Sequence, residues 1–279
     1  MSRRRVDTEL VRRGMARSRV HAAELIDQGR VAVDGVTVAK AAAQIAPAQA
    51  LAVAAAPSGE PEYASRGGHK LAGALDVLGS VDDGAPPISG AIALDAGAST
   101  GGFTDVLLRR GAAHVTAVDV GYGQLSWRLR TDPRVTVRER TNVRFLADGD
   151  IDPPPGLVVA DLSFISLTTV IGALAAVAGP AAHFLLMVKP QFEVGKDALP
   201  AGGVVRDPAQ RAEAVARVVA AARDVGLYLH HVVRSPLPGP SGNVEFFIHV
   251  TRDREGALVG DGARAAIVGE TGNGAGVAA

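Results

Sequence analysis

Four ionisable residues of this 279-residue chain lie beside apolar segments, where an ionised side chain is costly unless it is paired. They are Lys70 in SRGGHKL, Asp161 in VVADLSF, Lys189 in LLMVKPQF and Glu245 in SGNVEFF. Three of them begin or end predicted strands, and the carboxyl ends of parallel strands are where α/β proteins bind ligands. We therefore treat these four as the candidate catalytic residues.

A glycine-rich segment, LDAGASTGGFT at residues 94–104, follows an apolar run and raises the question of a bound cofactor. A dinucleotide fingerprint has a glycine where Ser99 stands, which disfavours a nicotinamide dehydrogenase, and the lysine of a P-loop is absent. Asp95 would repel a pyrophosphate but suits an ammonium group, and Asp119 is placed to hydrogen-bond a ribose. A ligand with a ribose, an amino group and no phosphate is S-adenosylmethionine. A tight turn without a ligand is the alternative interpretation.

The candidate cofactor site contains residues from this loop and from the ends of the neighbouring strands. They are Asp95, Gly97, Ala98, Ser99, Thr100, Gly101, Gly102, Phe103, Asp119, Val120, Asn142 and Asp161. Phe103, Tyr122 and Trp127 could stack on adenine or on a flipped base, although we expect at least two of them in the core. The histidines lack the spacing of metal ligands, so we expect no metal.

Composition excludes several kinds of chemistry. The chain has no cysteine, which rules out disulfides, thiolate zinc sites and cytosine C5 methylation through a cysteine adduct. Asp161-Leu162-Ser163-Phe164 lacks the prolines that are usual where base amino groups are methylated. Residues 162–188 carry no Asp, Glu, Lys or Arg, but Gly179-Pro180 interrupts them, so we predict a buried helix and strand there instead of a membrane span. The first residues lack a signal peptide, and we expect a cytoplasmic protein.

The elements that must position these residues alternate along the chain. Predicted strands are AIALDAG, HVTAVDV, VTVRER, LVVADLS, HFLLMVK, LYLHHVV and EFFIHVT, and the clearest predicted helix is PAQRAEAVARVVAAARDVG. Near-continuous apolar strands alternating with helices indicate a mostly parallel sheet covered on both faces. The last two strands have no helix between them, so we predict an antiparallel edge.

The first part of the chain reads as a separate basic module. Residues 6–53 predict two short helices, a hairpin turning at Asp34-Gly35 and a third strand, and a Pro/Gly-rich linker follows. Residues 1–40 hold nine Lys/Arg and five acids, although the net charge of the whole chain is zero. Such an end predicts an anion-binding module. The candidate RNA-contacting residues are Arg3, Arg4, Arg5, Arg17, Arg19 and Arg66.

The Lys-Asp-Lys-Glu set, in this order on a methyltransferase-type sheet, resembles the FtsJ-type ribose 2′-O-methyltransferases. The phrases SRGGHKL, DAGASTGGFT, DVGYGQL, ADLSFISL, VKPQFEVGK, GGVVRDP and PLPGPSGNVE are similar to the TlyA family of bacterial rRNA cytidine 2′-O-methyltransferases, sometimes labelled haemolysin A. RVDTELVRRGMARSR and GRVAVDG resemble an S4 RNA-binding domain. The resemblance covers about residues 3–250.

The resemblance implies an α/β fold, namely a Rossmann-like class I methyltransferase with a seven-stranded mostly parallel sheet, preceded by a small α+β S4 domain. We expect the S4 domain at 1–56, a linker at 57–66 and the methyltransferase domain at 67–252. Residues 253–279 are expected to form a C-terminal tail, largely disordered at its end.

The implied activity is S-adenosylmethionine-dependent 2′-O-methylation of cytidine in 16S and/or 23S ribosomal RNA. Lys189 is the candidate base, Asp161 would counter the charge of Lys70, and Glu245 would orient the hydroxyl or a lysine. The expected partners are ribosomal RNA or ribosomal subunits, without membrane or metal, and we expect a monomer. The alternatives are a non-catalytic RNA-binding or ribosome-assembly protein and a membrane-lytic haemolysin.

Overall fold

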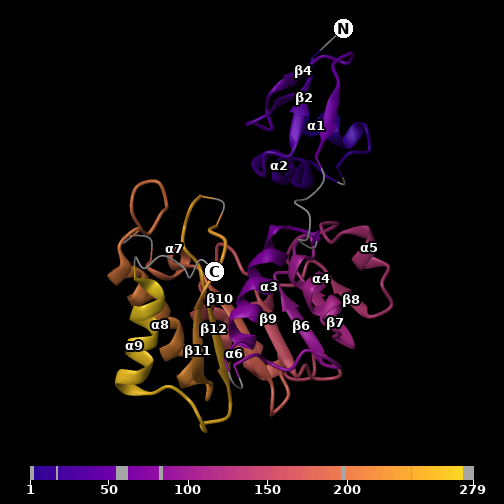
Figure 1. The fold of residues 1–279 in the computed structure, drawn as a ribbon. Coiled ribbons are helices and arrows are strands. Elements are labelled where there is room, and N and C mark those ends of the chain that lie inside the picture. Colours follow the sequence, from indigo (N-terminus) through magenta and orange to yellow (C-terminus); the bar gives the residue numbers. More distant parts are fainter. Residues whose placement is uncertain are drawn as a thin grey trace. The chain divides into compact units, whose positions relative to one another are not determined.

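A computed structural model describes residues 3–16, 18–54, 62–81, 84–195, 199–239 and 241–272 (Figure 1). The chain divides into two compact units, Met1–Arg66 and Gly67–Ala279, here called unit 1 and unit 2. Each unit has a core of its own, as the short apolar runs before residue 54 and the longer ones after residue 90 require. The domain boundaries expected from the sequence stay predictions.

Unit 1 combines two helices with short strands. Its elements are β1 (Arg4–Arg5), α1 (Val6–Arg12), α2 (Arg19–Asp27), β2 (Val31–Val33), β3 (Val36–Thr37), β4 (Gln44–Ile45) and β5 (Leu51–Val53). β2 lies between β3 and β5, and β1 pairs with β4. The predicted hairpin turn is present, with φ of 49° at Asp34 and 81° at Gly35, the left-handed conformation that a two-residue turn needs. Leu10 and Ile26 from the two helices and Val31 from the sheet form the core.

Unit 2 is built on the predicted seven-stranded, mostly parallel sheet. Its strands are β6 (Ile92–Ala96), β7 (His114–Val118), β8 (Val135–Arg138), β9 (Leu157–Ala160), β10 (His183–Val188), β11 (Tyr228–Arg234) and β12 (Phe246–Thr251), in the order β11-β12-β10-β9-β6-β7-β8. β12 runs antiparallel to both of its neighbours. The last two strands therefore form the predicted antiparallel edge, with β11 outermost and β12 inserted between β10 and β11.

Helices cover both faces of this sheet (Figure 1). They are α3 (Arg66–Gly79), α4 (Gly102–Arg109), α5 (Trp127–Arg130), α6 (Leu167–Val177), α7 (Pro190–Glu193), α8 (Pro208–Asp224) and α9 (Gly260–Thr271), with the 3-10 turn η1 (Val143–Phe145). α6 and α8 pack on one face, where Phe246 and Ile248 lie in the same core cluster. Phe247 points to the opposite face, and its ring centroid lies 5.9 Å from that of Phe103 in α4.

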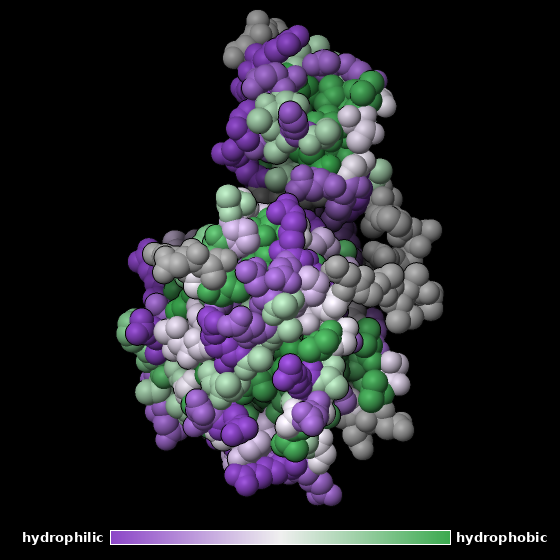
Figure 2. Space-filling view, turned by 90° about the vertical axis from the view of Figure 1, so that its left-hand side faces the viewer, coloured by the Kyte–Doolittle hydropathy of each residue, from purple (hydrophilic) through white to green (hydrophobic). Residues whose placement is uncertain are grey.

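Helix α9 lies where the sequence predicted a tail. It contacts α8 and β11, it buries Ile267 and Thr271, and its Glu270 accepts a hydrogen bond from Arg234 N at 2.8 Å. The prediction missed it because its glycines and sparse apolar residues give little helical periodicity, so tertiary packing must stabilise it. The last residues, 273–279, lie outside the described ranges. On the face of unit 2 drawn in Figure 2, hydrophilic and hydrophobic side chains are interspersed in small groups.

Candidate active site

The order of the strands places the functional loops side by side. β6 pairs in parallel with β7 on one side and with β9 on the other, so Ala96 is opposite both Val118 and Ala160. The chain continues from β6 and β7 toward one edge and from β9 and β10 toward the other. This is the type of switch point where α/β sheets bind ligands outside their carboxyl ends. Asp119 and Asp161 follow these strands directly.

The glycine loop is fitted closely to its neighbours. Gly97 has a φ of 87°, and a Cβ placed on it would be 2.6 Å from the carbonyl oxygen of Asp161. Asp119 receives hydrogen bonds from the backbone N–H of Ser99 at 2.8 Å and of Gly121 at 2.7 Å. Ser99 itself has a φ of 47°, a strained conformation for a residue other than glycine. The predicted cofactor loop is thus a rigid turn joined to the ends of both adjacent strands.

Asp95 is fully buried beneath this loop. Its Oδ2 accepts hydrogen bonds from Thr104 N at 2.9 Å and Thr104 Oγ1 at 2.6 Å, at the start of α4. Its Oδ1 is buried and has no hydrogen-bond partner among the described residues. The pKa of Asp95 is raised to about 7, chiefly by burial and to a smaller extent by the charges of Asp161 and Asp119, although the Thr104 hydrogen bonds lower it. An unpaired acceptor of this kind is suited to a donor from a ligand.

The remaining predicted cofactor residues differ in their exposure. Ala98 is buried and Thr100 is half-buried within the loop, whereas Val120 and Asn142 are exposed after β7 and β8. Asn142 Oδ1 accepts the N–H of Arg144 and so caps η1. Phe103 is buried in the core, so its ring is closed to stacking.

The expectation about the three aromatic residues was wrong. Tyr122 and Trp127 are both exposed, at 69% and 76%, so only Phe103 belongs to the core. Sequence could not distinguish them, because all three stand in similar short segments near the glycine loop.

The four candidate catalytic residues form two ion pairs. Lys70 Nζ lies 2.5 Å from Glu245 Oε2, and Lys189 Nζ lies 2.6 Å from Asp161 Oδ1. Lys189 directly follows β10 and Glu245 directly precedes β12, next to the paired residues Val188 and Phe246. The sequence argument paired Asp161 with Lys70, and the structure corrects this: Asp161 pairs with Lys189, and Glu245 pairs with Lys70.

Two glycines allow Lys70 and Glu245 to meet. A Cβ on Gly73, one turn after Lys70 in α3, would be 2.6 Å from Cγ of Pro236. A Cβ on Gly239 would be 2.6 Å from Oε1 of Glu245. The segment after β11 therefore packs directly against α3 and against the carboxylate, and both members of this pair are buried.

Sequence reasoning missed a group of residues around Lys189. Ser163 Oγ accepts a hydrogen bond from Lys189 Nζ at 2.8 Å. The next residue, Phe164, is 92% exposed, has a φ of 64° and lies beside the ring of Phe192 at 5.3 Å. A non-glycine residue in this conformation is strained, and such strain gathers at functional sites. The only signal in the sequence was the position of Ser163 and Phe164 two and three residues after Asp161.

Glu193 joins the two loops that carry these residues. It is buried in α7, and its carboxylate accepts hydrogen bonds from Ser166 Oγ at 2.5 Å and from Leu167 N at 2.9 Å, at the start of α6. Burial raises the pKa of Glu193, while the hydrogen bonds from Ser166 and Leu167 lower it. Because α7 directly follows Lys189 and α6 follows Ser163, Glu193 fixes the distance between the two loops.

In unit 1, three of the six predicted RNA-contacting arginines pair with two buried acids. Arg5 and Arg19 both pair with Asp7, and Arg4 pairs with Glu9. Arg66 is half-buried at the start of α3, Arg3 is exposed, and Arg17 lies outside the described residues.

Comparisons with known proteins agree with this geometry. The FtsJ-like methyltransferase family matches residues 63–252, and the S4 domain matches residues 4–48. The 16S/23S rRNA (cytidine-2′-O)-methyltransferase TlyA of Mycobacterium tuberculosis is 52% identical over 96% of this chain and 97% of its own length. The chain belongs to the TlyA family of FtsJ-like methyltransferases.

Two further proteins similar to this chain carry a hemolysin name. Hemolysin A of Brachyspira hyodysenteriae is 33% identical over 88% of this chain and 98% of its own length. A solved structure from Streptococcus thermophilus, described as a candidate hemolysin, has a TM-score of 0.71 and 32% identity and covers 97% of this chain and 96% of its own. In the described part of this chain, no helix is both long and apolar enough to cross a membrane.

Proposed function

We propose that this protein transfers the methyl group of S-adenosylmethionine to the 2′-hydroxyl of a cytidine in ribosomal RNA. The observation that carries the proposal is the presence of two lysine–carboxylate pairs beside the glycine loop at the carboxyl edge of the sheet. Lys70, Glu245 and Lys189 are buried, and Asp161 is half-buried. A ribose hydroxyl is a poor nucleophile at neutral pH and needs a base and a methyl donor held in line. Lysine and carboxylate side chains supply acid–base chemistry without metal or thiol.

The residues around the glycine loop fit this cofactor. Asp95 Oδ1 is a buried acceptor without a partner in the described part of the chain, as an amino group of the methionine moiety would require. Asp119 is half-exposed, and each of its oxygens accepts one backbone N–H, which leaves further acceptor capacity for ribose hydroxyls. Gly97 leaves no room for a side chain where the loop meets Asp161. When bound, S-adenosylmethionine supplies an electrophilic methyl group on its sulfonium.

Lys189 is the residue that we assign to the proton of the 2′-hydroxyl. Its Nζ is fixed by Asp161 and by Ser163, so its position is set before RNA arrives. An ammonium cannot accept a proton, so Lys189 acts as a base only after it has lost one. Lys70, paired with Glu245, is the residue that we assign to stabilising the developing alkoxide.

Unit 1 supports RNA as the substrate class. It matches the S4 domain and carries exposed arginines, while the close relative from Mycobacterium tuberculosis is named for methylation of cytidine in 16S and 23S rRNA. We assign ribosomal RNA as the partner, the cytoplasm as the compartment and a monomer as the acting form.

The test is methylation of isolated ribosomal subunits by the purified full-length chain with isotope-labelled S-adenosylmethionine, followed by nucleoside mass spectrometry. We expect 2′-O-methylcytidine with the wild-type protein and none with Lys189→Ala. Label in a base, or in a nucleoside other than cytidine, would contradict the assignment. A wild-type protein that binds subunits and transfers no methyl group would favour the non-catalytic RNA-binding alternative.

A further inference from the structure

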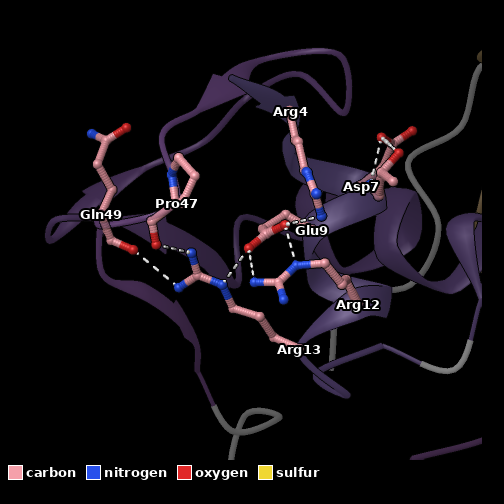
Figure 3. A network of polar contacts seen from close by, with 8 residues as sticks. Arg4, Asp7, Glu9, Arg12, Arg13, Pro47 and Gln49 are labelled. Carbon is pink, nitrogen blue, oxygen red and sulfur yellow. Dashed lines mark hydrogen bonds and ion pairs between the residues drawn. The ribbon is translucent and has the colours of Figure 1, made fainter. Parts of the chain in front are cut away.

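The first turn of α1 carries two buried carboxylates, Asp7 and Glu9, which together contact five arginines. Arg4, Arg12 and Arg13 turn toward Glu9, and their side chains converge on one carboxylate (Figure 3). Arg12 donates to it from Nε at 2.7 Å and from Nη2 at 2.5 Å, and Arg13 donates from Nε at 2.8 Å. Arg4 lies further away, at 3.8 Å.

Asp7 is the centre of a second group. Arg5 donates to it from Nε at 3.1 Å and from Nη2 at 2.9 Å, and Arg19, at the start of α2, lies 3.1 Å away. The carboxylate also accepts the N–H of Thr8 at 2.7 Å. Asp7 therefore joins the guanidinium groups of β1 and α2, which are separated by more than a dozen residues of sequence.

Burial in this network is asymmetric. The side chains of Asp7 and Glu9 are 5% and 1% exposed, whereas those of Arg4, Arg5, Arg12 and Arg19 are 45–61% exposed. The acids thus lie beneath a layer of guanidinium groups that faces solvent. Five positive charges against two negative ones leave a net charge of +3 on this part of unit 1.

The acids remain ionised at any working pH. Hydrogen bonds from Arg5 and Arg19 hold the pKa of Asp7 far below its usual range, although burial opposes this. Those from Arg12 and Arg13 lower the pKa of Glu9 to about 2. The buried carboxylates need counter-charges, but four of the five arginines keep their guanidinium groups largely in solvent, where they remain accessible to RNA. Arginines fixed in position lose less side-chain entropy when they bind phosphate oxygens.

We propose that Asp7 and Glu9 are positioning residues that hold the arginines of unit 1 as a fixed array for RNA phosphates. This inference rests on the proposed RNA substrate. Arg13 has a different place in the array, since it also donates to the carbonyl oxygens of Pro47 and Gln49 and so ties α1 to the segment before β5. Arg4, Arg5, Arg12 and Arg19 present the solvent-facing guanidinium groups.

The inference makes a prediction opposite to that of simple charge counting. Asp7→Asn and Glu9→Gln each remove a negative charge, which by itself should strengthen binding to RNA. If the acids position the arginines, each substitution should instead weaken it, by about tenfold at moderate salt, because charge-assisted hydrogen bonds depend on geometry. Asp27→Asn is the matched control, since Asp27 is exposed at the end of α2 and outside the network.

The experiment measures binding of the full-length variants to a fluorescein-labelled RNA stem–loop over a range of salt concentrations. We expect weaker binding and a shallower salt dependence for Asp7→Asn and Glu9→Gln, and wild-type or tighter binding for Asp27→Asn. Network variants that bind as tightly as Asp27→Asn would overturn the inference while leaving the RNA substrate intact. A wild-type chain that does not bind RNA, or that binds anionic lipid vesicles in preference to it, would overturn both.

A second measurement covers the case in which a substitution unfolds unit 1. In the wild-type chain without RNA, NMR relaxation of the arginine Nε–Hε groups should show Arg5, Arg12, Arg13 and Arg19 to be as ordered as the backbone. Freely reorienting guanidinium groups would contradict a fixed array, whatever the variants do.

Discussion

Lys189 Nζ lies 2.6 Å from Asp161 Oδ1, and both residues directly follow adjacent parallel strands. Lys189 is therefore held by Asp161 on the neighbouring strand and by Ser163. Lys70 and Glu245 form a separate pair. In the proposed mechanism, the pair of Lys189 and Asp161 exchanges a proton with the substrate, and the pair of Lys70 and Glu245 supplies a positive charge.

The role of Lys189 as a base is tested by Lys189→Arg. Guanidinium keeps the charge and much of the bulk but stays protonated at any working pH, so turnover should be lost by at least about a hundredfold. S-Adenosylmethionine affinity, measured by calorimetry, should change little in this variant. A Lys189→Arg enzyme with near wild-type rate would show that only the charge matters.

The buried pair of Lys70 and Glu245 is tested by a double-mutant cycle. Glu245→Gln leaves a buried ammonium without its counter-ion and should lower the free energy of unfolding by about 3–5 kcal/mol. Lys70→Met should also destabilise, and the double variant should cost less than the two single variants together. The exposed pair Arg217 and Glu213 is the control, where Glu213→Gln should cost about 0.5 kcal/mol or less. Additive effects in chemical denaturation would exclude the coupling.

Gly97 provides a test of the cofactor loop. Gly97→Ala places a Cβ against the carbonyl oxygen of Asp161 and also strains the backbone, so it should cost more than about 3 kcal/mol and abolish S-adenosylmethionine binding. Gly123 has a φ of 70° but no atom within 4 Å of its Cβ position. Gly123→Ala should therefore lower the free energy of unfolding only by the cost of the left-handed backbone conformation, about 1–2 kcal/mol, and S-adenosylmethionine should still bind. Equal effects of both variants would argue against close packing at Gly97.

The pKa of Asp95 predicts a pH dependence of folding. This carboxyl titrates near pH 7 in the folded protein and near 3.8 when unfolded, so the unfolded state binds fewer protons between these values. The free energy of unfolding should consequently fall as pH rises from about 4 to 7, and the loss is complete above 7. Asp95→Asn should flatten this dependence in denaturation curves measured at several pH values. An unchanged slope would mean that Asp95 is ionised in the fold.

The same group links cofactor binding to proton release. If Asp95 Oδ1 accepts the amino group of S-adenosylmethionine, binding must favour the ionised carboxyl, so a proton should leave near pH 6–7. Calorimetry in buffers of different ionisation enthalpy measures this release, and Asp95→Asn should lack it. Identical proton release in both proteins would place the ammonium group elsewhere.

Glu193 is expected to support the geometry around Lys189. Glu193→Ala leaves Leu167 N without an acceptor and frees the Ser163–Ser166 segment, at a cost of about 1–3 kcal/mol in stability. The turnover number should fall while S-adenosylmethionine affinity remains, because the cofactor loop lies on β6 and β7. Activity measured well below the melting temperature separates the two effects. Full activity there would show that Glu193 serves only stability.

Much of the fold followed from local patterns in the sequence. The seven strands of unit 2 are short, apolar and separated by turn residues, and Asp34-Gly35 is one of the dipeptides that favour a two-residue hairpin turn with positive φ at both positions. Helix α9 could not be predicted from such patterns, because its stability comes from the packing of Ile267 and its contacts with α8 and β11, and its own apolar periodicity is weak.

The sequence by itself singled out the four charged residues of the candidate site, because ionisable residues beside buried apolar segments are rare, but it did not single out Ser163 or Glu193. Only the tertiary structure decided how the four charged residues pair. Lys70 and Glu245 are 175 residues apart, and nothing local favours Glu245 over Asp161 as the partner of Lys70. The insertion of β12 beside β10, with the packing of Gly73 against Pro236, brings that carboxylate to α3. Ion pairing depends on distances of a few ångströms, and those are fixed by the packing of the whole chain.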